Sequence, residues 1–112
     1  TTLTSLTDKD IKEIGYTKSV KNLVIHQAKL AKKANLDAIV CSAHEAKDVK
    51  KIFKKEIITP GIKLNLKSYD QKRVMTPKKA FENGSDWLVI GRSLTKNNIK
   101  NNIKNLIDQL KK

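Results

Sequence analysis

The stretch Trp87-Leu88-Val89-Ile90-Gly91-Arg92-Ser93 decides which fold the sequence predicts. Its four consecutive apolar residues are typical of a parallel strand that is covered on both faces in an α/β protein. Such strands present their carboxyl ends to ligands. Gly91 lets a ligand approach the backbone closely, and the Arg92 guanidinium offers a planar set of donors that suits a phosphate. We therefore predict a buried strand over 87–90 that leads into an anion site at Gly91 and Arg92.

The same order of strand, turn and helix recurs along the chain. Helix starts are indicated at Thr7-Asp8, at Ser19, at Ser42 with Glu45 in capping-box spacing, and at Thr76-Pro77. Strands are expected over 1–6, 38–41, 57–59 and 87–90. The last helix is expected to bury an apolar stripe made of Ile99, Ile103, Leu106, Ile107 and Leu110. Sequential β-α-β units build a right-handed parallel sheet, so four such units predict either a small open sheet or half of a barrel.

Length and charge limit the alternatives. The 112 residues form one predicted domain, 1–112, and are far fewer than the roughly 250 of a closed eight-stranded α/β barrel. The net charge of +13 comes almost entirely from lysines, which are spread over every predicted helix. One Trp, two Tyr and two Phe are too few and too scattered to form stacking platforms for bases. We therefore interpret the charge as a compositional bias, and nucleic acid is not the expected partner.

Other site classes find little support in the sequence. Cys41 is the single cysteine, which excludes an intrachain disulfide and fits a reducing cytoplasm. His26 and His44 lie far apart without acidic or cysteine neighbours at ligand spacing, so no metal site is predicted. No apolar run approaches the roughly 20 residues that span a bilayer, and no secretory signal is recognised. A soluble cytoplasmic protein without membrane contact is expected.

Three loops are expected to meet at the carboxyl edge of the predicted sheet. They are Thr4-Ser5, the segment from Lys63 to Gln71, and Gly91-Arg92. Phosphate sites of eight-stranded barrels lie most often in the loops after the last two strands, which favours a phosphorylated ligand here. Spacing alone leaves a second interpretation open, in which Gly91 only relieves crowding and Arg92 is solvated. Lys63 taken by itself is interpreted as a surface lysine.

Five motifs together resemble the carboxyl-terminal half of bacterial orotidine 5′-monophosphate decarboxylases. They are Leu3-Thr4-Ser5, Leu36-Asp37-Ala38-Ile39-Val40-Cys41-Ser42, Thr59-Pro60-Gly61-Ile62, Asp70-Gln71-Lys72-Arg73-Val74-Met75-Thr76-Pro77 and Ile90-Gly91-Arg92. The resemblance covers essentially all 112 residues. It implies an α/β fold in which this chain is the carboxyl-terminal half, four βα units, of a TIM (β/α)8 barrel. It also implies a cofactor-free homodimeric lyase that makes uridine monophosphate from orotidine monophosphate in pyrimidine biosynthesis.

The resemblance also implies roles for five residues. Thr4 contacts the pyrimidine, Gln71 lies on a lid-like loop over the substrate, and Gly91 and Arg92 hold the 5′-phosphate. Lys63 stands where the family has arginine, and lysine keeps the charge but loses the bidentate geometry.

The family's catalytic Asp-x-Lys-x-x-Asp motif does not occur in this chain, so none of its residues is expected to be catalytic. We expect a fragment, or one chain of a split copy, whose partner is the amino-terminal half of the barrel. Two other functions stay open: a basic module that binds RNA or acidic surfaces, and a related sugar-phosphate decarboxylase of the same barrel type.

Overall fold

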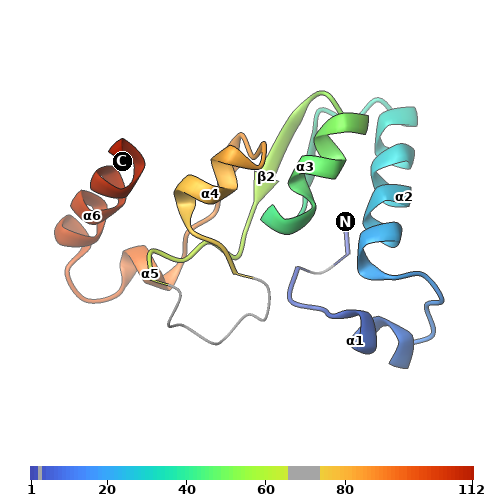
Figure 1. The fold of residues 1–112 in the computed structure, drawn as a ribbon, viewed down its shortest axis with the longest axis horizontal. Helices are drawn as coiled ribbons and strands as arrows, with labels where there is room; N and C mark the ends of the chain where they lie inside the picture. Colours follow the sequence, from blue (N-terminus) through green and yellow to red (C-terminus); the bar gives the residue numbers. More distant parts are fainter. Residues whose placement is uncertain (3, 66–73) are drawn as a thin grey trace.

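A computed structural model describes residues 1–2, 4–65 and 74–112 (Figure 1). Its helices are α1 (Asp8–Glu13), α2 (Val20–Lys33), α3 (Ala43–Ile52), α4 (Pro77–Glu82), α5 (Arg92–Thr95) and α6 (Ile99–Lys111). Its strands are β1 (Ala38–Val40), β2 (Glu56–Thr59) and β3 (Trp87–Leu88).

The three strands form one parallel sheet in the order β1-β2-β3. Ile39 pairs with Ile57, and Thr59 pairs with Leu88. Parallel neighbours in chain order, each followed by a helix, are what the repeat of strand, turn and helix predicted. The α/β architecture and the parallel sheet are therefore confirmed.

The strand predicted over 1–6 is not formed in the described part of that segment. Thr1 donates from its amino group and from Oγ1 to the carbonyl oxygen of Val40, at 3.1 and 2.8 Å. Thr2 donates from its backbone N and from Oγ1 to Gln27 Oε1, at 2.7 and 3.1 Å. These bonds tie residues 1–2 to β1 and α2 without forming a strand, and residues 4–5 form a turn.

Helix starts agree closely with the sequence. Ser19 Oγ accepts from Asn22 N at the start of α2, and Ser42 Oγ accepts from His44 N at the start of α3. Helix α4 begins at Pro77 as predicted, although Thr76 makes no capping hydrogen bond through its side chain. Gly84, with φ +102°, follows the last turn of α4 in the left-handed region that glycine adopts without strain.

The core consists of two clusters on one side of the sheet. The larger cluster joins α1, α2 and α3 to β1 and β2, and its fully buried members include Ile11, Val24, Val49 and Ile57. The smaller cluster packs Leu88 and Ile90 against Ala43, Ile62 and Ala80. Cys41 is fully buried, as expected for a small apolar side chain at the end of a strand.

The opposite face of the strand around β3 is uncovered, contrary to the prediction of a strand buried on both faces. Trp87 is 59% exposed and Val89 is 53% exposed, whereas Leu88 and Ile90 alternate with them and pack on the core. The apolar run therefore correctly predicted a strand, which covers only Trp87–Leu88 of the expected 87–90, but wrongly predicted burial on both faces. Nothing in the described chain covers the second face of the sheet.

Helix α6 also differs from expectation, because none of its residues is buried. Ile99, Ile103, Ile107 and Leu110, called the α6 stripe below, are each at least 40% exposed. Leu106, which also belongs to the predicted stripe, is half-buried. Polar bonds also attach the helix: Asn102 Nδ2 donates to the carbonyl oxygens of Leu94 and Lys96 at 2.9 and 2.7 Å.

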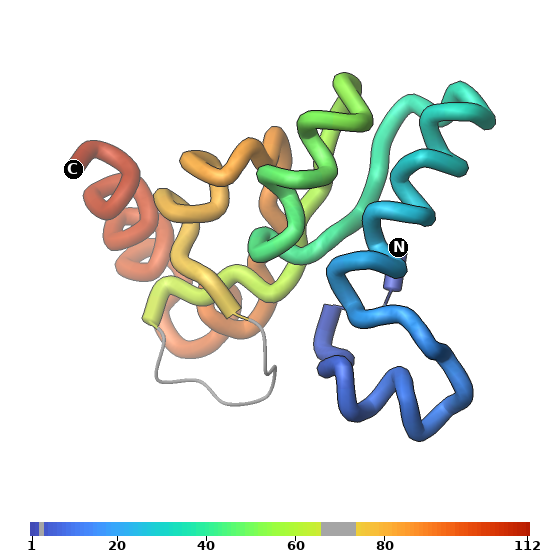
Figure 2. Tube along the Cα trace, turned by 45° about the vertical axis from the view of Figure 1, so that its right-hand side comes forward, coloured from blue at the N-terminus to red at the C-terminus, as the bar shows by residue number. Residues whose placement is uncertain are grey.

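The molecule is flat and extended. Helix α6 stands at the opposite end from α1 and α2 (Figure 2), and the extents are 42 × 31 × 19 Å. The radius of gyration of 14.8 Å exceeds the roughly 13 Å of a compact domain of this length. The shape is that of an open wedge rather than a closed barrel.

Candidate functional site

The loop after β2 is held by its two stems. Gly61 turns the chain with φ +74°, and Ile62 then forms a parallel bridge with Met75. Lys63 N donates to Met75 O at 3.1 Å, and Met75 N donates to Gly61 O at 3.2 Å. The backbone on the amino side of Lys63 is therefore fixed by hydrogen bonds.

Lys63 is buried, with 7% of its surface exposed, so its interpretation as a surface lysine is wrong. Within the described ranges, no hydrogen bond or ion pair reaches its ammonium group. Burying a charge without a partner is unfavourable, and an anion brought to the ammonium would supply that partner.

Leu64 links this loop to α5. Its backbone N donates to Ser93 Oγ at 3.2 Å, and its carbonyl oxygen accepts from Gln109 Nε2 at 3.0 Å. Ser93 follows Arg92 directly, and Leu64 follows Lys63 directly. The structure thus brings the backbones of the two predicted phosphate-binding segments together, as expected for loops that follow adjacent parallel strands.

Gly91 caps the amino end of α5 and faces open space. A Cβ built on Gly91 would meet no atom of another residue within 4 Å, and its φ of −91° is not a conformation reserved for glycine. Relief of crowding inside the chain is therefore not the reason for a glycine here. Arg92 begins α5 and is exposed, as a residue that receives a ligand from solvent can be.

The second stem of the loop is held by residues that sequence reasoning did not assign to the site. His44 Nε2 lies 3.2 Å from Val74 O, and it carries the proton because a carbonyl oxygen can only accept. Asn83 Nδ2 donates to Ala43 O at 3.2 Å and lies 3.4 Å from Met75 Sδ. The only signal in the sequence was the place of His44 in the first helical turn after a strand, which is a weak one.

The remaining predicted residues are less well defined. Thr4 is half-buried in the turn at 4–5, after the segment that Thr1 and Thr2 tie to β1 and α2. Residues 4–7, the described loop after β2 and α5 all lie toward the lower side of Figure 1. Gln71 lies outside the described residues.

One described acidic group, Asp86, is held at the other end of the sheet. Asp86 precedes β3, at the amino end of the sheet, and accepts from Lys50 Nζ at 2.6 Å and from Ile57 N at 2.8 Å. Burial by itself raises the pKa of Asp86, but these two hydrogen bonds and the charge of Lys50 outweigh it, so the pKa is lowered.

Among the residues that the structure describes, no group of three or more His, Cys, Asp or Glu side chains is placed to hold a metal ion. No described helix has the length and apolarity that a bilayer crossing needs.

Comparison with known protein families identifies the chain. The model of the orotidine 5′-phosphate decarboxylase / HUMPS family matches residues 1–104. The chain belongs to this family. The match includes the strands of the sheet, the loop stems and the Gly91-Arg92 corner.

Individual members of the decarboxylase family are similar over the same region. The orotidine 5′-phosphate decarboxylase of Coxiella burnetii (strain RSA 493 / Nine Mile phase I) is 48% identical over 112 residues, which are 97% of this chain and 48% of the relative. That of Wolbachia sp. subsp. Brugia malayi is 49% identical over 100 residues, which are 88% of this chain and 44% of the relative. The chain therefore spans about half the length of these relatives, and it matches their carboxyl-terminal part.

Solved structures give the same picture. The crystal structure of orotidine 5′-phosphate decarboxylase from Lactobacillus acidophilus aligns with a TM-score of 0.77 and 28% identity, over 100% of this chain and 47% of the other. An uncharacterized conserved protein from Geobacillus kaustophilus aligns with a TM-score of 0.73 and 32% identity. The open wedge is accordingly part of a decarboxylase-type TIM barrel.

Proposed function

We propose that this chain supplies the substrate-binding half of an enzyme that decarboxylates orotidine 5′-monophosphate to uridine 5′-monophosphate. The observation that carries the proposal is the buried Lys63, which has no counter-charge among the described residues. Its neighbour Leu64 is hydrogen-bonded to Ser93, the residue that follows the Gly91-Arg92 corner. Two cations and an open glycine at one edge of a parallel sheet suit a phosphate monoester. The named relatives favour the nucleotide enzyme over a sugar-phosphate decarboxylase.

Each residue has a proposed role in binding. Arg92 and Lys63 hold the 5′-phosphate, and Gly91 lets it approach the backbone. Thr4 contacts the pyrimidine, and Gln71 contacts the substrate from the loop after β2. No cofactor or metal takes part in the proposal. Phosphate binding far from the reacting carbon contributes energy that the enzyme uses to organise its reacting site.

The chemical step is assigned to a partner. The described acidic and basic groups include no lysine held between two aspartates, the arrangement that the family's Asp-x-Lys-x-x-Asp motif provides. We propose that the amino-terminal half of the barrel supplies this array and covers Trp87, Val89 and the α6 stripe. A cytoplasmic homodimer of complete barrels belongs to the same proposal.

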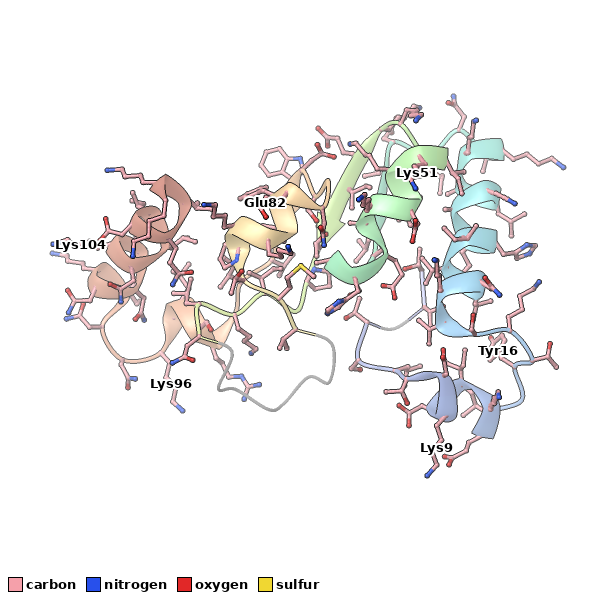
Figure 3. All side chains as sticks on the ribbon, viewed as in Figure 1. Lys9, Tyr16, Lys51, Glu82, Lys96 and Lys104 are labelled. Carbon is pink, nitrogen blue, oxygen red and sulfur yellow. The ribbon has the colours of Figure 1, made fainter. Side chains whose placement is uncertain are left out.

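A nucleic-acid module is not favoured by the arrangement of charge. Lys9, Lys51, Lys96 and Lys104 lie on or beside four different helices, spread over the molecule from α1 to α6 (Figure 3). Such a distribution differs from the basic stripe that follows a nucleic-acid backbone.

A chimeric enzyme tests the proposed function. The amino-terminal part of the Coxiella burnetii relative is joined to this chain, and loss of the orotidine monophosphate absorbance is followed. We expect turnover, and binding of uridine monophosphate that depends weakly on salt, whereas binding of RNA through many lysines would weaken steeply. A folded chimera without turnover or nucleotide binding would contradict the proposal.

Arg92→Ala tests the anion site within that chimera. Loss of a charge-assisted hydrogen bond should weaken binding of uridine monophosphate by about 1.5–3 kcal/mol. Lys96→Ala is the matched control, because it removes an equal charge four residues away and should change affinity little. Equal affinity of the Arg92→Ala chimera and its parent would contradict the proposal that Arg92 binds the phosphate.

A further inference from the structure

Leu64 has both of its backbone polar groups bound by side chains from other elements. Ser93 Oγ, on α5, accepts from Leu64 N at 3.2 Å, and Gln109 Nε2, on α6, donates to Leu64 O at 3.0 Å. Leu64 is half-buried, where an unsatisfied backbone group is costly. Two side chains that are 16 positions apart in sequence therefore hold one peptide position.

This arrangement, called the Leu64 clamp below, adjoins Lys63. On the other side of Lys63 the bridge between Ile62 and Met75 fixes the backbone, and Lys63 N itself donates to Met75 O. The Leu64 clamp fixes the backbone on the carboxyl side of Lys63. Because the backbone of Lys63 is already held, no further backbone entropy is lost there when its ammonium group binds an anion.

The clamp also contributes to the attachment of α6, a helix with no buried residue, to the rest of the chain. Helix α6 is joined to α5 through Asn102 and to the loop after β2 through Gln109. Both bonds come from its polar side chains, while the α6 stripe stays exposed. A polar side chain of α6, Gln109, thus helps to hold the segment that carries Lys63.

We propose that Ser93 and Gln109 are positioning residues that, through the backbone of Leu64, hold Lys63 buried beside the Gly91-Arg92 corner. The assignment rests on the proposed function for its ligand, a nucleoside monophosphate, but the placement of Lys63 is a property of the chain itself. Neither residue touches the ligand in this proposal. Their effect on affinity passes through Lys63.

Chemical labelling measures that placement without any ligand. The chain is treated with N-acetoxysuccinimide, and acetylation of each lysine is followed by mass spectrometry. Buried Lys63 should react slowly, with exposed Lys104 as the fast internal reference. Ser93→Ala and Gln109→Met should each accelerate labelling of Lys63 roughly fivefold, the factor expected for the loss of one hydrogen bond. Ser93→Thr, which keeps the hydroxyl, should restore the slow rate.

Controls separate the clamp from general loosening of the fold. Lys50, ion-paired with Asp86 at the far end of the sheet, should keep its labelling rate in the variants. Asp108→Asn changes the neighbour of Gln109 on the exposed side and should leave Lys63 slow. Acceleration of Lys50 together with Lys63, or unchanged labelling of Lys63 in both clamp variants, would overturn the proposal.

A double-mutant cycle with uridine monophosphate then tests the link to binding in the chimeric enzyme. Ser93→Ala should weaken affinity when Lys63 is present and have no effect in the Lys63→Met background, because the clamp acts through that side chain. Equal effects in both backgrounds would show that Ser93 does not act through Lys63 and would overturn the proposal. If the parent chimera binds no nucleotide while Lys63 labelling still responds to Ser93→Ala, the clamp stands and the proposed function fails.

Discussion

At the scale of a residue, the carboxylate of Asp86 joins three elements of the fold. It receives Lys50 Nζ from α3 and the backbone N of Ile57 from β2, and it stands directly before β3. Three elements therefore meet at one side chain at the amino end of the sheet. Because its side chain is 38% exposed, solvent screens part of the interaction.

The lowered pKa of Asp86 predicts a pH-dependent contribution to stability. The folded carboxyl group loses its proton more readily than the unfolded one, so stabilisation is complete above the ordinary value of 3.8 and is lost as pH falls through the lower folded pKa. Asp86→Asn should reduce the free energy of unfolding at pH 7 by about 1 kcal/mol and flatten its dependence on pH below 4. Urea unfolding at several pH values measures both effects. An unchanged slope in acid would contradict the assignment.

At the scale of an element, helix α6 leaves most of its apolar side chains exposed to solvent. Its sequence has the apolar period of a buried helix, yet the α6 stripe is exposed and polar bonds hold the helix in place. Where a strong amphipathic pattern is left uncovered, the missing surface is expected on a partner. In the proposed function that partner is the amino-terminal half of the barrel.

Ile107→Ser tests this assignment of α6. Because Ile107 is already 46% exposed, the substitution should change the free energy of unfolding of the chain alone by roughly 0.5 kcal/mol or less. In the complex it should weaken association with the amino-terminal half by about 1.5–3 kcal/mol, the value of burying one large aliphatic side chain. Lys104→Ser is the control on the same helix. Titration calorimetry that gives equal affinities for both variants would remove α6 from the interface.

The whole molecule is a sheet covered on one face. Trp87 and Val89 lie on the uncovered face, and the strand order β1-β2-β3 leaves the outer side of β3 unpaired among the described strands. Exposed strand edges and apolar faces bind whatever complementary surface is available. The isolated chain is therefore expected to self-associate.

Two measurements follow at this scale. Sedimentation of the purified chain should show dimers or larger species, and addition of the amino-terminal half should give one monodisperse complex. The chain alone should not consume orotidine monophosphate, since its sequence does not contain the Asp-x-Lys-x-x-Asp motif, whereas the complex should. Turnover by the chain alone would show that the chemistry has been assigned to the wrong half.

The sequence by itself determined the parallel α/β fold, most helix starts and the position of the Gly91-Arg92 corner. These features depend on local signals: apolar runs, capping serines at 19 and 42, a proline at 77, and a glycine after a strand. Such signals act over a few residues and can be read without knowing the packing.

Only the tertiary structure decided which of these surfaces are covered and how the site is held. Three features depend on whether residues distant in sequence come into contact: the burial of Lys63, the exposure of Trp87 and the α6 stripe, and the bonds that tie Thr1 and Thr2 to Val40 and Gln27. The clamp joins Leu64 to Ser93 and Gln109 across 29 and 45 positions. Periodicity tells which side chains can be buried, but burial itself requires another element in contact with them.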